Sequence, residues 1–463
     1  MLFHTQAFLL AFLPVTVAAY YALAGRPQAR RWAVVLASLV FYGYWDWRLV
    51  PLLVLSVAIN WGLSLLPPRL TLRTVVALGV SANLAVLAFF KYADFLAGSA
   101  AALIGLKHDP YGIVLPLGIS FFTFQQISYL VDLGRGQAKR YRLADYALWV
   151  TLFPHLIAGP IIRHHEIIEQ FALGPLRPGL AERLSRGFVL LVLGIAKKVL
   201  IADQLAALAD PLFAAAHGGV ALSLAQAWVA GLAFSLQIYF DFSGYSDMAM
   251  GLAMLLGLML PVNFNAPYRA TSIREFWRRW HITLSRFLRD YLYIPLGGNR
   301  LGPAGRAAAT LVTMLLGGLW HGAGWTFVAW GGLHGLALAA NQAWAARGRR
   351  MPAPLGWVLT MLVVVVGFVL FRAADFGSAA SMVAGMAGLN GLKPAGAGLP
   401  PLAEMAILPL AGLLAVAGPP AHVLALERIK PLAWIAAPAA LAFVYLLLAV
   451  GGGRNTEFIY FQF

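Results

Sequence analysis

The stretch LLGGLWHGAGWTFVAWGGLHG, residues 315–335, is apolar and rich in glycine, yet it carries a histidine, His321, between two tryptophans. Ionisable side chains inside a membrane are rare because charging them there is unfavourable, and they usually mark a functional site. Neutral imidazole can accept a proton from a hydroxyl near neutral pH and return it to a leaving group. The stretch therefore predicts a catalytic His321. The structural alternative is a histidine hydrogen-bonded within a tight helix contact, which the neighbouring glycines permit.

The composition of the chain is that of an integral membrane protein. Of its 463 residues 61% are hydrophobic and 11% are charged, whereas soluble domains carry about 25% charged residues; the mean hydropathy is +0.76. The absence of cysteine excludes disulfides, thiolate nucleophiles and cysteine metal sites. We predict an all-α polytopic protein with a single membrane domain over residues 1–463. Its candidate spans are 5–25, 31–47, 49–66, 74–97, 112–131, 187–205, 222–242, 307–322, 325–345, 355–371, 405–423 and 432–451.

The net charge of +16 has two explanations. One is the excess of Lys and Arg on the cytoplasmic side together with contact to anionic lipids. The other adds a phosphate-rich substrate on that side. Residues 5–25 end in Ala-Leu-Ala, as a cleavable signal does, but no Lys or Arg precedes Arg26. We therefore expect a retained first helix that enters from outside.

Residues 146–160, YALWVTLFPHLIAGP, are too short to cross the membrane. Basic residues flank the segment on both sides, so both flanks are expected in the cytoplasm. We predict a re-entrant or interior segment, broken at Pro154 and Pro160.

Within residues 272–300 the sequence predicts a basic amphipathic helix that lies in the membrane interface, followed by the turn YIPLGGNR at 293–300. Ser272 and Glu275 form a capping box, a helix start signal. At 100° per residue, His281 falls at the edge of the polar face. A surface anchor would explain the arginines but not this histidine. The apolar face comprises Phe276, Trp277, Trp280, Leu284, Phe287, Leu288 and Tyr291, and the polar face Arg274, Glu275, Arg278, Arg279, Arg286, Arg289 and Asp290.

Two further clusters have ionisable side chains. In residues 238–251, where the apolar segment is expected to break, Asp241 is placed to orient a histidine or hold an arginine, and Asp247 to cap a helix. Residues 153–171 contain His155, His164, His165 and Glu166, but no third strong ligand follows at helical spacing, so no metal site is predicted. The chain has no phosphate-binding loop and no G-x-S-x-G elbow.

Long motifs over nearly the whole chain resemble the membrane-bound O-acyltransferase family, in its bacterial branch that includes alginate O-acetylation. The region about 350–455 is less similar. The motifs are FFTFQQISYLVDLGRG (121–136), FPHLIAGPIIR (153–163), YFDFSGYSDMAMGLAMLLGLMLPVNFNAPYRATSIREFWRRWHITLSRFLRDYLYIPLGGNR (239–300), GLWHGAGWTFVAWGGLHG (318–335) and FIYFQF (458–463).

The resemblance implies a ring of roughly 11–13 membrane or re-entrant helices around a thinned centre, where funnels from both faces meet near the catalytic histidine. The family's essential histidine matches His321, and its second recurrent histidine matches His281; we take both as catalytic. His334, Asp241, Asn299 and Trp320 are expected to support them, with His281 or Asn299 polarising the acyl carbonyl. Arg274, Arg278 and Arg279 are expected to hold the phosphates of a cytoplasmic thioester donor, acetyl-CoA. No metal and no bound cofactor are implied.

The same resemblance implies a multi-pass protein of the bacterial inner membrane that passes acetyl groups to a periplasmic acetyltransferase partner, and so to an exopolysaccharide such as alginate. Acylation of peptidoglycan, cellulose or teichoic acid is the alternative within the family. A proton-coupled transporter, with His321 as a relay, is the alternative from another class. Transporters often show inverted repeats with paired broken segments, but no sequence symmetry relates 146–160 to 261–300. Membrane lipids are expected partners, and nucleic acid is not.

Overall fold

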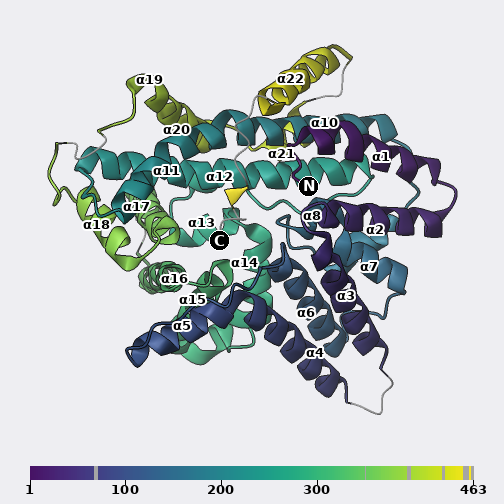
Figure 1. The fold of residues 1–463 in the computed structure, drawn as a ribbon, viewed down its shortest axis with the longest axis horizontal. Helices are drawn as coiled ribbons and strands as arrows, with labels where there is room; N and C mark the ends of the chain where they lie inside the picture. Colours follow the sequence, from purple (N-terminus) through teal and green to yellow (C-terminus); the bar gives the residue numbers. More distant parts are fainter. Residues whose placement is uncertain (67–70, 350, 394–397, 430–432, 452–457, 460–463) are drawn as a thin grey trace. The chain divides into compact units, whose positions relative to one another are not determined.

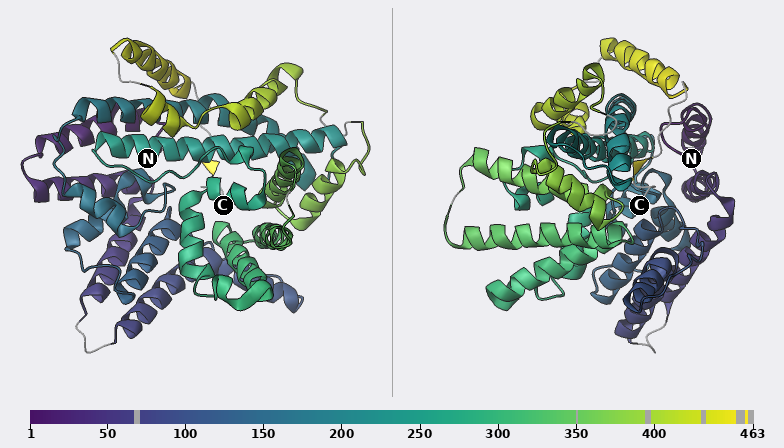
Figure 2. Two further views of the ribbon diagram at one scale, coloured as in Figure 1. Left: turned by 180° about the vertical axis from the view of Figure 1, so that it is seen from behind. Right: turned by 60° about the vertical axis from the view of Figure 1, so that its left-hand side comes forward.

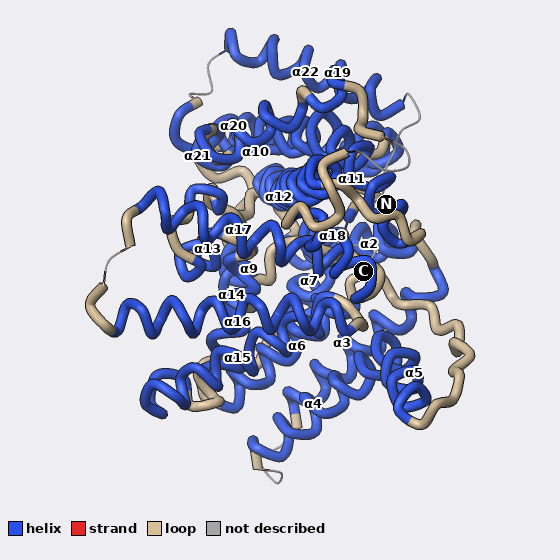
Figure 3. The backbone as a smooth tube through the Cα atoms, turned by 90° about the vertical axis from the view of Figure 1, so that its left-hand side faces the viewer, coloured by secondary structure: helices blue, strands red, loops and turns tan. Residues whose placement is uncertain are grey.

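A computed structural model describes residues 1–463 except 67–70, 350, 394–397, 430–432, 452–457 and 460–463. Every regular element in these described residues is a helix (Figures 1 and 3). The predicted all-α fold is therefore confirmed. The chain forms two compact units, Met1–Leu193 with Tyr245–Pro261 and Ala425–Asn455, and Gly194–Gly244 with Val262–Leu424 and Thr456–Phe463.

The first unit contains the amino-terminal helices, and α22 comes from the other end of the chain. Short π segments at Phe8–Phe12 and Ala88–Tyr92 precede α1 and α5, and a 3₁₀ turn at Trp47–Leu49 leads into α3. The helices are α1 (Leu13–Ala22), α2 (Pro27–Gly43), α3 (Val50–Leu65), α4 (Leu72–Leu87), α5 (Ala93–Leu103), α6 (Ile119–Gly134), α7 (Leu143–Thr151), α8 (Phe153–Leu156), α9 (His164–Phe171), most of α10 (Leu180–Ala196), and α22 (Ala433–Gly451).

The second unit contains the remaining helices and the three histidines expected in the active site. It begins with the π segment Lys197–Ala202, and further irregular turns occur at Pro267–Arg269, Arg289–Tyr293 and Gly298–Leu301. Its helices are α11 (Asp203–His217), the first part of α12 (Leu224–Leu255), α13 (Ile273–Arg279), α14 (Ile282–Leu288), α15 (Gly302–His321), α16 (Trp325–Ala346), α17 (Ala353–Arg372), α18 (Phe376–Met386), α19 (Leu402–Met405), α20 (Ile407–Ala417) and α21 (Ala421–Val423).

Several helices have the length and hydropathy of membrane spans. Trp47–Leu65, Leu72–Leu103 and Ala353–Arg372 qualify singly, and Leu402–Ala417 with Ala421–Arg428 qualify as a pair bent by 61°. The predicted span 112–131 is wrong in its first part, because α6 starts only at Ile119. Gly112 and Gly118 adopt positive φ in this region, a conformation that a helix does not use.

The interior segment predicted at 146–160 is buried within the first unit. It forms α7 and the single turn α8, and every residue from Tyr146 to Pro160 is buried. A Cβ atom on Gly118 would lie 2.8 Å from the Leu156 carbonyl oxygen. The two stretches therefore pack backbone against backbone. This is the environment that broken backbone needs at membrane depth.

In the second unit, α15 and α16 form a tight antiparallel pair, and α17 lies against α16 (Figure 2). Gly318 on α15 and Gly331 on α16 face each other at the point of closest approach. A Cβ on Gly318 would lie 2.2 Å from the Phe327 carbonyl oxygen, and one on Gly331 would lie 2.2 Å from the Met314 carbonyl oxygen. The glycines of the opening stretch thus permit contact between two helix backbones.

This contact predicts a difference between two adjacent glycines of α16. Gly331→Ala places a methyl group against the backbone of α15 and should destabilise the fold by about 1–3 kcal/mol. At Gly332 the nearest atom to a Cβ is a Leu315 methyl at 3.4 Å, so Gly332→Ala should be tolerated. Thermal unfolding of the purified variants in detergent would test this, and equal melting temperatures would contradict it.

Candidate active site

His321 is the last residue of α15 and is buried, with 5% of its surface exposed. Aromatic rings surround it: the ring centroids of Trp320, Trp330 and Phe371 lie 4.9, 5.0 and 5.3 Å from that of His321. The His281 ring is 6.4 Å away. The structure therefore brings together the two histidines that were predicted as catalytic.

The amphipathic helix predicted to start at Ser272 is interrupted at His281, which the prediction had placed within it. The helix stops at Arg279, His281 adopts φ 40° and ψ 55°, and α14 starts at Ile282. The segment 263–265 crosses this break: the Asn265 N–H donates to the Arg279 carbonyl, and the Ile282 N–H donates to the Asn263 carbonyl. These bonds satisfy backbone groups that a helix would otherwise have paired. The break moves His281 from the predicted polar edge into the core, where it is fully buried.

The side-chain oxygen of Asn263 sets the tautomer of His281. This Oδ1 accepts hydrogen bonds from the backbone N–H of Thr283 at 3.2 Å and from its hydroxyl at 2.9 Å, and it lies 3.2 Å from Nδ1 of His281. A backbone N–H can only donate, so the Asn263 atom is the oxygen and His281 Nδ1 carries the proton. The other ring nitrogen, Nε2, is buried without a hydrogen-bond partner among the described residues.

His281 lies outside the predicted spans, and burial lowers its pKa to about 3. The ring is therefore neutral near pH 7, and its Nε2 offers a lone pair. Apolar neighbours also favour the neutral form of His281, since the rings of Phe242 and Trp320 pack against it with centroids 4.8 and 6.2 Å away.

His334 has the opposite tautomer. The indole N–H of Trp277 donates to His334 Nδ1 at 3.3 Å, so Nε2 carries the proton. His334 is fully buried on α16, and its ring centroid lies 4.9 Å from that of Trp330. The Trp330 ring thus packs against the imidazole rings of both His334 and His321.

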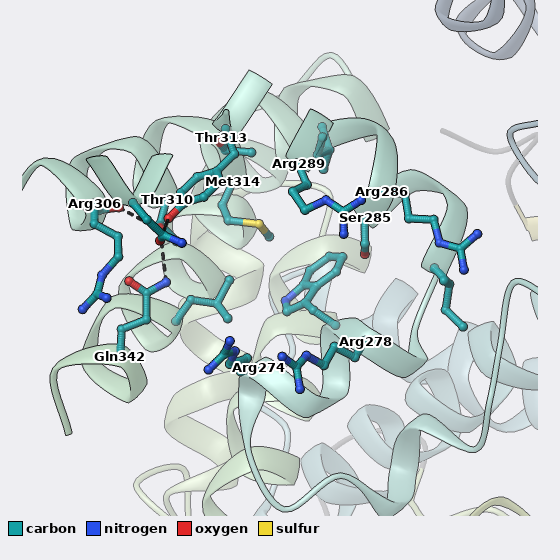
Figure 4. A pocket seen from close by; sticks show the side chains of 16 residues that line it. Arg274, Arg278, Ser285, Arg286, Arg289, Arg306, Thr310, Thr313, Met314 and Gln342 are labelled. Carbon is teal, nitrogen blue, oxygen red and sulfur yellow. Dashed lines mark hydrogen bonds between the residues drawn. The ribbon is translucent and has the colours of Figure 1, made fainter. Parts of the chain in front are cut away.

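Arginines surround a cavity of about 670 Å³ in the second unit (Figure 4). Arg274 and Arg278 come from α13 and Arg306 from α15. In Figure 4, Arg306, Thr310 and Gln342 lie together on one side of the cavity. The full lining is Arg274, Trp277, Arg278, Ile282, Ser285, Arg286, Leu288, Arg289, Tyr293, Asn299, Arg306, Thr310, Thr313, Met314, Leu338 and Gln342.

Two of the three predicted donor-binding arginines, Arg274 and Arg278, line this cavity, and Arg279 does not. Arg279 pairs with Glu275 at 2.9 Å and donates to the Asn265 carbonyl. Burial raises the pKa of Glu275, but hydrogen bonds from Thr271 and Arg279 outweigh this and lower the pKa overall. Arg279 thus stabilises the helix break.

Asn299 lines the cavity and is exposed, and its side-chain oxygen accepts a hydrogen bond from the Tyr293 hydroxyl at 2.8 Å. Its predicted role at the acyl carbonyl stays a prediction.

Asp241 lies inside α12, which continues unbroken through residues 238–251, so the predicted break there is wrong. The carboxylate lies 3.2 Å from Lys198, which lies 2.9 Å from Asp203. It also accepts a hydrogen bond from the Ile459 N–H at 2.8 Å. Among the described residues, the partners of Asp241 are therefore a buried lysine and the Ile459 backbone, and neither a histidine nor an arginine. Asp247 lies in the same helix and caps no break.

The histidines of residues 153–171 lie in the first unit. His155 Nδ1 is 3.0 Å from the Gln125 amide, and His164 contacts the Tyr141 hydroxyl at 2.9 Å and Asp132 at 3.5 Å. Across the described residues, no three histidine or carboxylate side chains gather as metal ligands do. These contacts suit a structural role for His164.

Comparison with known proteins identifies the family. The profile of the membrane-bound O-acyltransferase family matches residues 120–376. The chain belongs to the membrane-bound O-acyltransferase family.

Named relatives of this acyltransferase act on different polymers. The peptidoglycan O-acetyltransferase of Helicobacter pylori is 41% identical over 429 residues, which cover 85% of this chain and 81% of the relative. The probable alginate O-acetylase AlgI of Pseudomonas aeruginosa is 43% identical over 386 residues, covering 81% and 72%. The teichoic acid D-alanyltransferase of Streptococcus thermophilus is 29% identical over 282 residues, covering 55% and 68%. The chain is thus a multi-pass membrane enzyme that transfers an acyl group, and the transporter alternative is not supported.

Several residues that line the arginine cavity had no predicted role in donor binding. Arg286 and Arg289 were predicted only to lie on a polar face, and no role was predicted for Arg306. The sequence does contain a pattern that includes Arg306. Arg306, Thr310, Thr313 and Met314 are spaced so that they lie on one face of a helix, the face on which His321 also lies. The pairing of Asn263 with His281 had no local signal.

The ion pair between Lys198, on the π segment Lys197–Ala202, and Asp241, on α12, generates a stability prediction for the acyltransferase. Lys198→Met would leave the buried Asp241 carboxylate without this cation, and removing one member of a buried pair destabilises proteins by about 3–5 kcal/mol. The melting temperature of Lys198→Met in detergent should therefore fall strongly. Arg48→Met is the control, because the Arg48–Asp46 pair is exposed on the Arg48 side. Equal melting temperatures for the two variants would show that the buried pair is not needed.

Proposed function

We propose that this enzyme transfers acetyl groups from acetyl-CoA, bound on the cytoplasmic side, toward hydroxyl groups of a cell-envelope polysaccharide. The acceptor class follows from the relatives, which are named for peptidoglycan and for alginate. Exopolysaccharide acetylation through a periplasmic acetyltransferase partner, in the bacterial inner membrane, is the form that we favour. The peptidoglycan relative, which is about as similar, makes acetylation of peptidoglycan the second candidate.

One observation carries the donor assignment: a single face of α15 runs from the arginine-lined cavity to His321. Thr310, Thr313 and Met314 line the cavity. His321 follows Met314 by seven residues, which is nearly two turns on the same face and about 10 Å along the helix. A thioester whose anionic end lies in the cavity can therefore extend along this face to the histidine.

The charge of the cavity suits the phosphates of coenzyme A. Among the described residues, Arg289 pairs with Asp290 at 2.7 Å, whereas Arg274, Arg278, Arg286 and Arg306 form no salt bridge with a carboxylate. Unneutralised guanidinium groups favour phosphate, which they bind through charge-assisted hydrogen bonds.

Two buried polar atoms on one side of the cavity also suit a bound ligand. The Arg306 Nε–H and the Gln342 side-chain oxygen have no hydrogen-bond partner among the described residues. Such atoms are unfavourable when left unpaired. A ligand with one acceptor and one donor at this position would satisfy both.

The chemical step that we propose uses His321 as the general base. His321 takes the proton from the acceptor hydroxyl while the hydroxyl oxygen bonds to the acetyl carbon. The carbon–sulfur bond then breaks, and the proton passes from His321 to the thiolate of coenzyme A. No side chain of the enzyme needs to carry the acetyl group.

Purified protein in liposomes with radiolabelled acetyl-CoA tests this step. His321→Ala should lower acetyl release or transfer by about 100-fold or more, the usual contribution of general base catalysis. His217→Ala is the control, because His217 is exposed, pairs with Asp375 and does not line the arginine cavity. A folded His321→Ala protein with full activity would refute the assignment.

The donor site generates a second prediction. Arg274→Gln combined with Arg278→Gln should raise the KM for acetyl-CoA about tenfold or more, since hydrogen bonds to charged groups contribute about 1.5–3 kcal/mol each. Arg279→Gln removes the same charge from the neighbouring position but outside the cavity, so its KM should stay near that of the wild type. If Arg279→Gln raised the KM as strongly as the double variant, general charge and not the cavity would hold the donor.

A further inference from the structure

The hydrogen-bonding of His281 bears on the chemistry of the proposed reaction. A group that polarises the acyl carbonyl must direct an N–H or another proton donor toward the carbonyl oxygen. The only N–H of neutral His281 is at Nδ1, and it is engaged by Asn263. The nitrogen left for another group, Nε2, carries a lone pair. In this state His281 accepts a proton and cannot donate one.

We infer that Asn263 is a positioning residue that holds His281 as a proton acceptor, and that His281 shares, through one bridging water molecule, the proton that His321 takes up. The inference rests on the proposed function, which makes His321 the base.

The distance between the rings supports a bridge. Their centroids are 6.4 Å apart, and each ring nitrogen lies less than one ring-bond length from its centroid. Two nitrogens at this separation are beyond direct hydrogen-bond reach, which ends near 3.2 Å. A water molecule has two O–H donors and can lie between them and bond to both.

Aromatic rings pack around both histidines. Rings of Phe242, Phe264 and Trp320 pack against His281, and Trp320, Trp330 and Phe371 pack against His321. The next titratable ring is His334, on the other side of Trp330. In such apolar surroundings a lone pair that shares the proton stabilises the imidazolium of His321 strongly.

Burial and hydrogen bonds from Thr283 fix the orientation of the Asn263 amide. It is 1% exposed, and Thr283, 3% exposed, fixes its oxygen through both the backbone N–H and the hydroxyl. With its orientation held from one side, the amide oxygen can accept the His281 proton only in the Nδ1–H form. A positioned second residue of this kind fixes the tautomer of a catalytic histidine.

Nitrogen-15 NMR of histidine-labelled protein in detergent tests the tautomer directly. The His281 signal is identified by its loss in His281→Gln. We expect neutral His281 with the proton on Nδ1 in the wild type and in Thr283→Val, which keeps the backbone donor, and a mixed tautomer in Asn263→Leu. A wild-type His281 that is protonated at Nε2 at neutral pH would overturn the inference.

Acetyl transfer supplies the second readout. Asn263→Leu should lower kcat about tenfold or more while the KM for acetyl-CoA changes little, because the donor cavity is untouched. Asn263→Asp keeps the accepting oxygen and adds a negative charge, which raises the pKa of His281. It should restore part of kcat and move the acidic limb of its pH profile to higher pH.

The outcomes separate the two proposals. If Asn263→Leu does not fold, the pH profile of Asn263→Asp decides: an unmoved acidic limb would overturn the role of His281. If the wild type binds no acetyl-CoA, the proposed function fails, and the NMR result still decides the tautomer.

Discussion

The backbone contact between α15 and α16 is the constraint on which the candidate site depends. Gly318 precedes His321 by less than one turn, and Gly331 precedes His334 by the same interval. Because the two glycines meet at the helix crossing, they fix the positions of both histidines at once. Trp330, one residue before Gly331, then lies against both imidazole rings. A larger residue at the crossing would move the two histidines apart before it affected any catalytic side chain directly.

A second constraint is that α13 contributes side chains both to the arginine cavity and to the surroundings of His334. Trp277 lines the arginine cavity and also donates its indole N–H to His334. Arg274 and Arg278, four residues apart on this helix, line the same cavity, whereas Arg279, one position further on, pairs with Glu275 and donates to the Asn265 carbonyl. The same short helix therefore presents charge to the cavity and an aromatic ring to His334.

Much of this architecture could be predicted from the sequence because its signals are local. The all-helical fold, the interior segment at 146–160 and most of the apolar face of residues 272–300 follow from hydropathy and spacing. The break at His281 could not be predicted, because the bonds that replace helical ones come from Asn263 and Asn265, on a preceding segment without helical pattern. The partner of Asp241 was missed for the same reason, since Lys198 lies on a π segment far along the chain. Periodicity places a side chain on a face, but only the tertiary fold places its partner.

The buried pair of Lys198 and Asp241 has a consequence for how the chain inserts into the membrane during its synthesis. Both residues lie in segments that the sequence predicts as spans, and Lys198 leaves the ribosome well before Asp241. A lone charge at the centre of a membrane helix is unfavourable by about 2.5–3.5 kcal/mol during insertion. We therefore expect the segment that carries Lys198 to insert stably only after α12 has been synthesised, when Asp241 can neutralise the lysine. The order of synthesis, and not only the finished packing, thus becomes part of how this chain reaches its fold.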